Sequence, residues 1–143
     1  AGLVRLGERY PYLGSFTAQQ GTRVSDEHNT EGYVKVEATH NAPNLDTTEQ
    51  DLLDFLDTEK HPENQNLRGQ REGTYTLFGE ALFVLTGKRP DLNTVSRLPG
   101  SRHEGNVVRA RRSSVGRLFA AWFLLPRFHY PRIGARFEEV QST

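Results

Sequence analysis

Cysteine and methionine are both absent from this sequence of 143 residues, and tryptophan occurs once. Without cysteine the chain cannot form a disulfide framework, a thiolate metal site, a catalytic thiol or a redox switch. No apolar run approaches the roughly 20 residues that a membrane-spanning helix needs, which argues against an integral membrane protein. The length matches one domain of about 100–150 residues, so we expect residues 1–143 to form a single domain and exclude a large multidomain enzyme.

Apolar residues are also scarce. Hydrophobic side chains make up 35% of the chain, and its mean hydropathy is −0.67. A chain this poor in core-forming residues is expected to keep part of its length as loops or arms. Such segments often become ordered only against a partner.

Acidic and basic residues balance at 18 each, which argues against a surface that grips nucleic acid everywhere. They are unevenly placed. Residues 1–72 hold 13 acids and 7 bases (net −6), whereas residues 73–143 hold 5 acids and 11 bases (net +6). This asymmetry indicates either an interaction segment or two halves that attract each other within one domain.

Lysine is rare: 15 of the 18 bases are arginine. The planar guanidinium group suits carboxylates, phosphates and buried interfaces. Codon bias in a GC-rich genome explains the same excess, so the arginine content alone does not identify a partner.

The sequence begins at Ala1 without an initiator methionine. Two interpretations are open: removal of the methionine before a small residue, or removal of a longer leader. The second interpretation is compatible with an organellar, for example mitochondrial, location. A virion or a bacterial particle is an equally open setting.

The residue patterns predict a mainly α fold with irregular extended arms, a small helical core and at most a minor β element; an α+β fold is the alternative. Residues 1–45 are predicted to form an extended or looped arm with a short strand at 32–39. Residues 46–125 are predicted to form the helical core, and residues 126–143 an extended tail in which Pro126 and Pro131 prevent a helix.

Three helices are expected in the core. The first covers 46–60, with Asp46 or Thr47 as the N-cap and Pro62 beyond its end. The second covers 74–87, ends at Gly87, and is apolar nearly all round, which predicts burial on most sides; a buried strand pair is the rival interpretation. A turn-rich connection follows over 88–105.

The third helix is expected over 106–125, between the capping residue Asn106 and Pro126. Its apolar residues fall at helical spacing on one face: Val108, Val115, Leu118, Phe119, Trp122 and Leu125.

The densest basic cluster lies in and just before this third segment. It is a candidate contact for an anion or a nucleic acid, and its members are Arg102, Arg109, Arg111, Arg112 and Arg117. The alternative is a solvated basic face that docks on the acidic stripe of the first helix, formed by Asp51, Asp54 and Asp57.

The run 118–130 is the most hydrophobic part of the chain. Aromatic residues and arginine are enriched at the cores of protein interfaces, so this region is predicted to contact a partner subunit. The candidate interface residues are Phe119, Trp122, Phe123, Phe128, Tyr130 and Ile133. A core helix and a helix in peripheral contact with a membrane surface are the alternatives.

Motifs for catalysis, cofactors and metals are missing. The five histidines show no metal-binding spacing, and no P-loop, GxGxxG or GxSxG is present. We therefore expect no cofactor and no metal. If the chain were an enzyme, His103 and Glu104 would be the place to look for a pocket with a titratable group.

These observations favour a non-catalytic structural subunit of a larger multiprotein complex, which docks through extended termini and its aromatic-rich C-terminal third. A nucleic-acid-binding module that uses the arginine cluster is the first alternative. A small cofactor-independent enzyme is the second.

Overall fold

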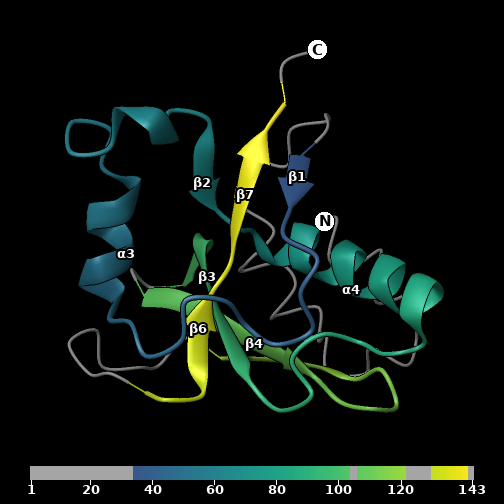
Figure 1. Ribbon diagram of the computed structural model, residues 1–143. Coiled ribbons are helices and arrows are strands. Elements are labelled where there is room, and N and C mark those ends of the chain that lie inside the picture. Colours follow the sequence, from purple (N-terminus) through teal and green to yellow (C-terminus); the bar gives the residue numbers. More distant parts are fainter. Residues whose placement is uncertain (1–33, 104–105, 122–129, 142–143) are drawn as a thin grey trace.

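The computed structural model describes residues 34–103, 106–121 and 130–141. In these residues two helices and two β-sheets are arranged as Figure 1 shows. The helices are α3 (Glu49–Leu56) and α4 (Glu72–Thr86), with a 3-10 turn, η2 (Pro62–Asn64), between them. The strands are β1 (Val34–Val36), β2 (Leu67–Gly69), β3 (Val95–His103), β4 (Asn106–Arg112), β5 (Leu118–Ala121), β6 (Ile133–Ala135) and β7 (Phe137–Val140).

The mainly α fold predicted from the sequence is wrong, because the described part of the chain is mostly β. Strands account for 33% of it and helices for 27%. Strand β1 lies inside the range 32–39 where a short strand was expected, and α3 and α4 overlap the first two predicted helices. The error lies in the described residues 88–103 and 106–121, where β3, β4 and β5 replace the predicted connection and most of the predicted third helix.

In the predicted helix 106–125, the described residues 106–121 are not helical, and they were misinterpreted because their apolar spacing fits two periods. In β4 the buried residues Val108, Ala110 and Arg112 alternate with Arg109 and Arg111, which is the period-2 pattern of a strand.

Gly116 separates β4 from β5. Its φ of 94° is a backbone conformation that an α-helix does not contain, and its amide donates to the Ser113 carbonyl at 3.0 Å to close the turn. The chain therefore reverses in a hairpin where the helix was expected to continue.

The connection predicted over 88–105 contains the longest strand. Pro99 and Gly100 lie within β3, at a point where its register with β4 shifts between Leu98 and Arg102. Proline is tolerated in a strand at such an irregularity because no ladder hydrogen bond is required of it there. The two residues that looked like a turn in the sequence thus bend a strand.

Capping groups mark the start of α3 and the end of α4, and α3 ends at Leu56 rather than at the predicted residue 60. The N-cap of α3 is Thr48 rather than Asp46 or Thr47: its hydroxyl accepts from the Asp51 amide, and the Asp51 carboxylate accepts from the Thr48 amide in return. Gly87 ends α4 in the left-handed conformation, and its amide donates to the Phe83 carbonyl.

The strands form a three-stranded sheet in the order β1-β7-β2 and a four-stranded sheet in the order β5-β4-β3-β6. All described pairs are antiparallel except β3 with β6. Only Arg136 separates β6 from β7, so one stretch of chain passes from the four-stranded sheet into the centre of the other (Figure 1). The Arg136 amide donates to the Arg97 carbonyl, and the Arg136 carbonyl accepts from the Gln70 amide.

Two glycines allow the sheets to approach where β2 meets β3. The Gly100 amide donates to the Gln70 carbonyl at 3.2 Å. A Cβ on Gly69 would lie 2.4 Å from the Gly100 nitrogen, and one on Gly100 would lie 2.2 Å from the Gly69 carbonyl oxygen. Larger residues would therefore force the two backbones apart.

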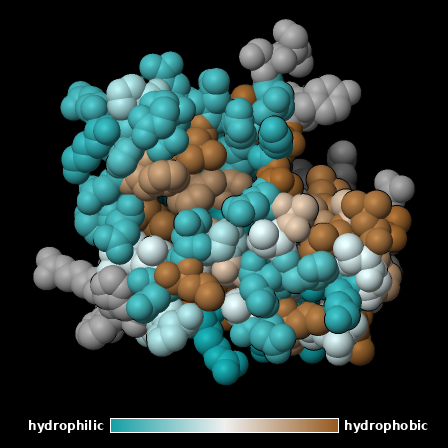
Figure 2. Space-filling model, in the orientation of Figure 1, coloured by the Kyte–Doolittle hydropathy of each residue, from teal (hydrophilic) through white to brown (hydrophobic). Residues whose placement is uncertain are grey.

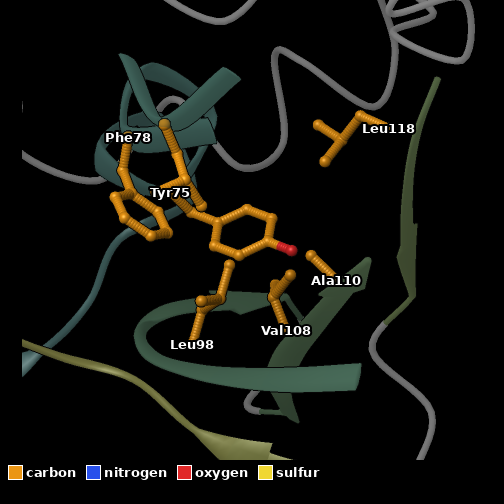
Figure 3. Close-up of a cluster of buried hydrophobic side chains, with 7 residues drawn as sticks. Tyr75, Phe78, Leu98, Val108, Ala110 and Leu118 are labelled. Carbon is orange, nitrogen blue, oxygen red and sulfur yellow. The ribbon is translucent and has the colours of Figure 1, made fainter. Parts of the chain in front are cut away.

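The hydrophobic core lies between α4 and one face of the four-stranded sheet. Tyr75, Phe78 and Leu82 of α4 pack on apolar side chains from three strands (Figure 3). The strand residues are Leu98, Val108, Ala110 and Leu118. We call this the inner face of the four-stranded sheet and the opposite one its outer face.

Candidate functional site

The outer face of the four-stranded sheet brings together residues from both predicted sets. Arg109 lies opposite Ala121, and Arg111 lies opposite Phe119 in the register of β4 and β5. Residues directly opposite in a ladder share a face, so the arginines predicted to bind an anion lie beside an aromatic residue predicted to contact a partner.

These side chains line a shallow depression of about 380 Å³. The Arg111 guanidinium lies 4.4 Å from the centre of the Phe119 ring, and that of Arg117 lies 6.0 Å from it. Both distances are in the range of cation–π attraction. The stacking holds Arg111 across β5 while the side chain remains exposed.

Arg97 extends the same face onto β3, opposite Arg109. It is buried, and its guanidinium donates to the Thr47 carbonyl at 3.0 Å. Burial lowers the pKa of Arg97, an effect opposed by the charge of Glu49. Arg97 therefore joins the sheet to the segment that precedes α3, and Arg109 and Arg111 are the arginines of β4 left on the outer surface.

Arg112 lies on the inner face and is fully buried, so it does not share the exposed surface of Arg111. Its guanidinium donates to the Glu80 carboxylate of α4 and to the Gly116 carbonyl. Its role in the structure is to join β4 to α4 and to the following turn.

The remaining arginines of the predicted cluster, Arg102 and Arg117, do not line this depression. Arg102, on β3, lies 3.5 Å from the Glu49 carboxylate of α3. Arg117, in the turn before β5, is exposed. Glu49 lies at the start of α3 and is not part of the predicted acidic stripe. Within that stripe, Asp51 caps the helix and Asp54 pairs with Lys60.

Half of the predicted interface residues can be placed. Ile133 of β6 lies opposite Val95, which also lines the depression, and is half-buried. Tyr130 is half-buried as well, and so is Phe119. The other three, Trp122, Phe123 and Phe128, lie outside the described residues.

A second surface was missed by the sequence analysis. Helix α4, predicted to be buried on most sides, is buried only on the side of Tyr75, Phe78 and Leu82. A row of apolar residues at helical spacing is exposed on it: Leu77 (55%), Ala81, Val84 (82%) and Leu85 (82%). Figure 2 shows hydrophobic side chains gathered over this helix. The sequence signal for this surface was a helix that is apolar nearly all round, a pattern that is also typical of an exposed face that contacts a partner.

The place where a catalytic pocket was to be sought, at His103 and Glu104, is described only in part. His103 is the last residue of β3, and Glu104 lies outside the described residues. Among residues 34–103, 106–121 and 130–141, no three acidic or histidine side chains are grouped so that they could hold a metal ion. In the same ranges no helix has the length and apolar character to cross a membrane.

A buried polar network holds the loops around the C-terminal end of α4. The Asp91 carboxylate accepts from the hydroxyls of Tyr75, Thr94 and Ser96 at 2.6–2.7 Å, and Arg136 lies 3.4 Å from it. Burial and the negative charge of Asp91 raise the pKa of Tyr75 well above its ordinary value, so this hydroxyl remains a donor.

Comparison with models of known protein families, with curated proteins and with solved structures found no match.

Proposed function

We propose that this chain is a non-catalytic structural subunit of a larger protein assembly and that it docks on a different protein subunit through the exposed face of α4. The observation that carries the proposal is the apolar row Leu77, Ala81, Val84 and Leu85. Leaving such side chains in water costs about 25 cal/mol per Å² of apolar surface, which contact with an apolar partner surface removes.

The size of this row supports an assembly with more than one contact. A standard interface uses about 20–30 residues from each partner, whereas the row has four members over less than three helical turns. Homodimerisation through α4 alone would be weak for the same reason. The outer face of the four-stranded sheet supplies a second candidate contact, where Arg111 and Phe119 suit a partner that carries carboxylates.

The test compares two substitutions that add the same charge at equally exposed sites. Val84→Glu lies in the apolar row, and Val115→Glu, at 76% exposure on the turn between β4 and β5, is its matched control. Each tagged chain is expressed in its native source, and the mass of the particle that contains it is measured by light scattering.

We expect the unaltered chain and Val115→Glu in a particle much heavier than 16.2 kDa, and Val84→Glu released from it with an unchanged unfolding curve. A lone chain in the native source contradicts the proposal, and so does a Val84→Glu chain that stays in the particle. A pure dimer of this chain contradicts the part that names a different subunit.

Nucleic-acid binding by the outer face is the second candidate function, favoured by one observation. Arg109 and Arg111 project from the same side of β4 next to the ring of Phe119, and exposed arginines beside an aromatic ring bind phosphates and stack on bases. The test is fluorescence anisotropy with a single-stranded oligonucleotide. Binding should weaken as salt rises from about 50 to 200 mM and should fall in Arg111→Ala; binding that salt leaves unchanged argues against it.

A further inference from the structure

A cleft of about 470 Å³ opens beside the C-terminal end of α4, and it shares no lining residue with the exposed row of α4 or with the depression on the outer face. This volume lies within the range of small-molecule sites, about 300–1,000 Å³. Its polar lining comes from three separate parts of the chain: His40, Asn41, Lys88, Arg89, Asn93 and Ser114. Phe83 and Leu92 provide its apolar walls.

The lining is positively charged. Lys88 and Arg89 contribute two cations, and no carboxylate of the described residues lines the cleft. The nearest acid that an ion pair connects to it is Glu80, which lies 3.9 Å from Arg89 and also accepts from the buried Arg112. In a chain with a net charge of zero, this is a local excess of positive charge suited to an anion.

Several donors around the cleft are not engaged by the protein. In the part of the chain that the structure describes, the side chains of Asn41, Lys88, Asn93 and Ser114 make no hydrogen bond or ion pair. An ammonium group, two amides and a hydroxyl are therefore available to a ligand. Arg89 is held beside these donors, because its guanidinium stacks on Phe83 at 3.8 Å from the centre of the ring.

The walls of the cleft are held by the buried network of Asp91. The Asp91 amide donates to the His40 carbonyl, and the Thr94 hydroxyl, which itself donates to Asp91, accepts from the Ala42 amide. The His40 ring nitrogen Nε2 lies 3.0 Å from the Thr86 hydroxyl of α4. The segments that carry His40 and Asn93 are thus fixed relative to α4 before any ligand arrives, which lowers the entropic cost of binding.

We propose that this cleft binds a small organic phosphate of nucleotide size. Lys88 and Arg89 hold the phosphate, Asn41 and Asn93 donate to and accept from the polar groups of the organic part, and Phe83 and Leu92 cover its apolar face. The proposal is independent of the docking function of α4, since the cleft residues do not belong to the exposed apolar row.

The test is a titration of the full chain, labelled with nitrogen-15, with adenosine monophosphate, inorganic phosphate and adenosine, followed by amide chemical shifts. We expect saturable shifts at Lys88, Arg89 and Asn93 with the monophosphate, weaker binding of inorganic phosphate, and the weakest binding of adenosine. No saturable shift at these amides with the monophosphate overturns the proposal.

Substitutions of Ser114, which lines the cleft, supply variants matched in size that differ in charge. Ser114→Glu places a carboxylate in the cleft, and Ser114→Gln has nearly the same size without the charge; Ser114 is exposed, so both variants should fold. We expect Ser114→Glu to weaken the binding of the monophosphate by about 10-fold and Ser114→Gln to have little effect on it. Lys88→Ala should weaken it similarly, whereas Lys35→Ala, on β1 outside the cleft, should not. Equal affinities of all four variants overturn the proposal.

A final comparison distinguishes a small-molecule phosphate from the phosphate at the end of a nucleic acid. A short single-stranded oligonucleotide with a 5′-phosphate is compared with the same strand without it and with the monophosphate. Tighter binding of the monophosphate than of either strand supports the small-molecule site. Binding of the phosphorylated strand more than about 10-fold tighter than the monophosphate overturns the small-molecule source in favour of a nucleic-acid end.

Discussion

The hydroxyl of Tyr75 donates a 2.6 Å hydrogen bond to the carboxylate of Asp91, which joins α4 to the loop before β3 in the interior of the protein. Both residues are fully buried. Thr94 and Ser96 also donate to Asp91, and Arg136 approaches from the segment between β6 and β7. A chain with few apolar residues thus uses a satisfied polar network at a place where α4 and both sheets meet.

Tyr75→Phe should lower the free energy of unfolding by about 1–3 kcal/mol, because it removes one donor from a buried carboxylate and leaves the packing intact. Urea denaturation followed by circular dichroism measures the change. Leu77→Ala, on the exposed side of the same helix, is the control and should change stability by less than about 0.5 kcal/mol. Equal effects of the two substitutions would contradict the buried hydrogen bond.

The same tyrosine should make the protein less stable in alkali. The pKa of Tyr75 in the folded state lies well above the ordinary value of 10.0, because of burial and the charge of Asp91. Its contribution is fully present below pH 10 and is lost as the pH rises above that value, since only the unfolded state then releases the proton. The expected slope is about 1.4 kcal/mol per pH unit. Stability curves of Tyr75→Phe measured above pH 10 should lack this component; an identical slope in both proteins would refute it.

Adjacent arginines on β4 should differ sharply in their effect on stability. Arg112→Ala removes the partner of Glu80 and of the Gly116 carbonyl in the interior, which should cost about 3–5 kcal/mol. Arg111→Ala removes an exposed side chain that stacks on Phe119 and should cost less than about 1 kcal/mol. Thermal and urea unfolding of both variants measures the difference. Similar losses in the two variants would contradict the buried position of Arg112 beside an exposed Arg111.

Gly116→Ala distinguishes the hairpin from the helix at a single position. Gly116 has a φ of 94°, where an alanine Cβ is strained, so the variant should lose about 1–2 kcal/mol of stability. In the middle of a helix the same substitution would stabilise by roughly 0.5–1 kcal/mol. Ser114→Ala, in the same turn, is the control for a change of side chain without backbone strain. A more stable Gly116→Ala protein would contradict the turn.

Local signals in the sequence located the two helices, although α3 ends at Leu56 rather than at the predicted residue 60. Pro62 and Gly87 lie beyond the ends of α3 and α4, and the acids Glu49 and Asp51 lie in the first turn of α3, where the helix dipole favours them. Even here the N-cap moved to Thr48, because the choice among neighbouring polar residues depends on which side chain reaches the amide three residues on.

The candidate site was predictable only in part. Arg109, Arg111 and Phe119 were identified by residue type, yet their adjacency depends on the pairing of β4 with β5, which no local pattern in the sequence specified. Arg112 could not be separated from Arg111 while the segment was thought to be helical. The apolar row on α4 was visible as sequence, but its exposure depends on which side of the helix the sheet covers.

By itself, the sequence determined that cysteine chemistry is excluded, that acids and bases balance and that apolar residues are scarce. It also located the two helices, because each of these properties depends on composition or on contacts a few residues apart. The tertiary structure decided the rest. Pairing between strands formed β3, β4 and β5, and their sheet buried Arg112 and left Arg111 outside. The network of Asp91 joined segments as distant as His40 and Arg136. The physical reason is that a strand has no internal hydrogen bonds, so its existence depends on a partner that the local sequence does not contain.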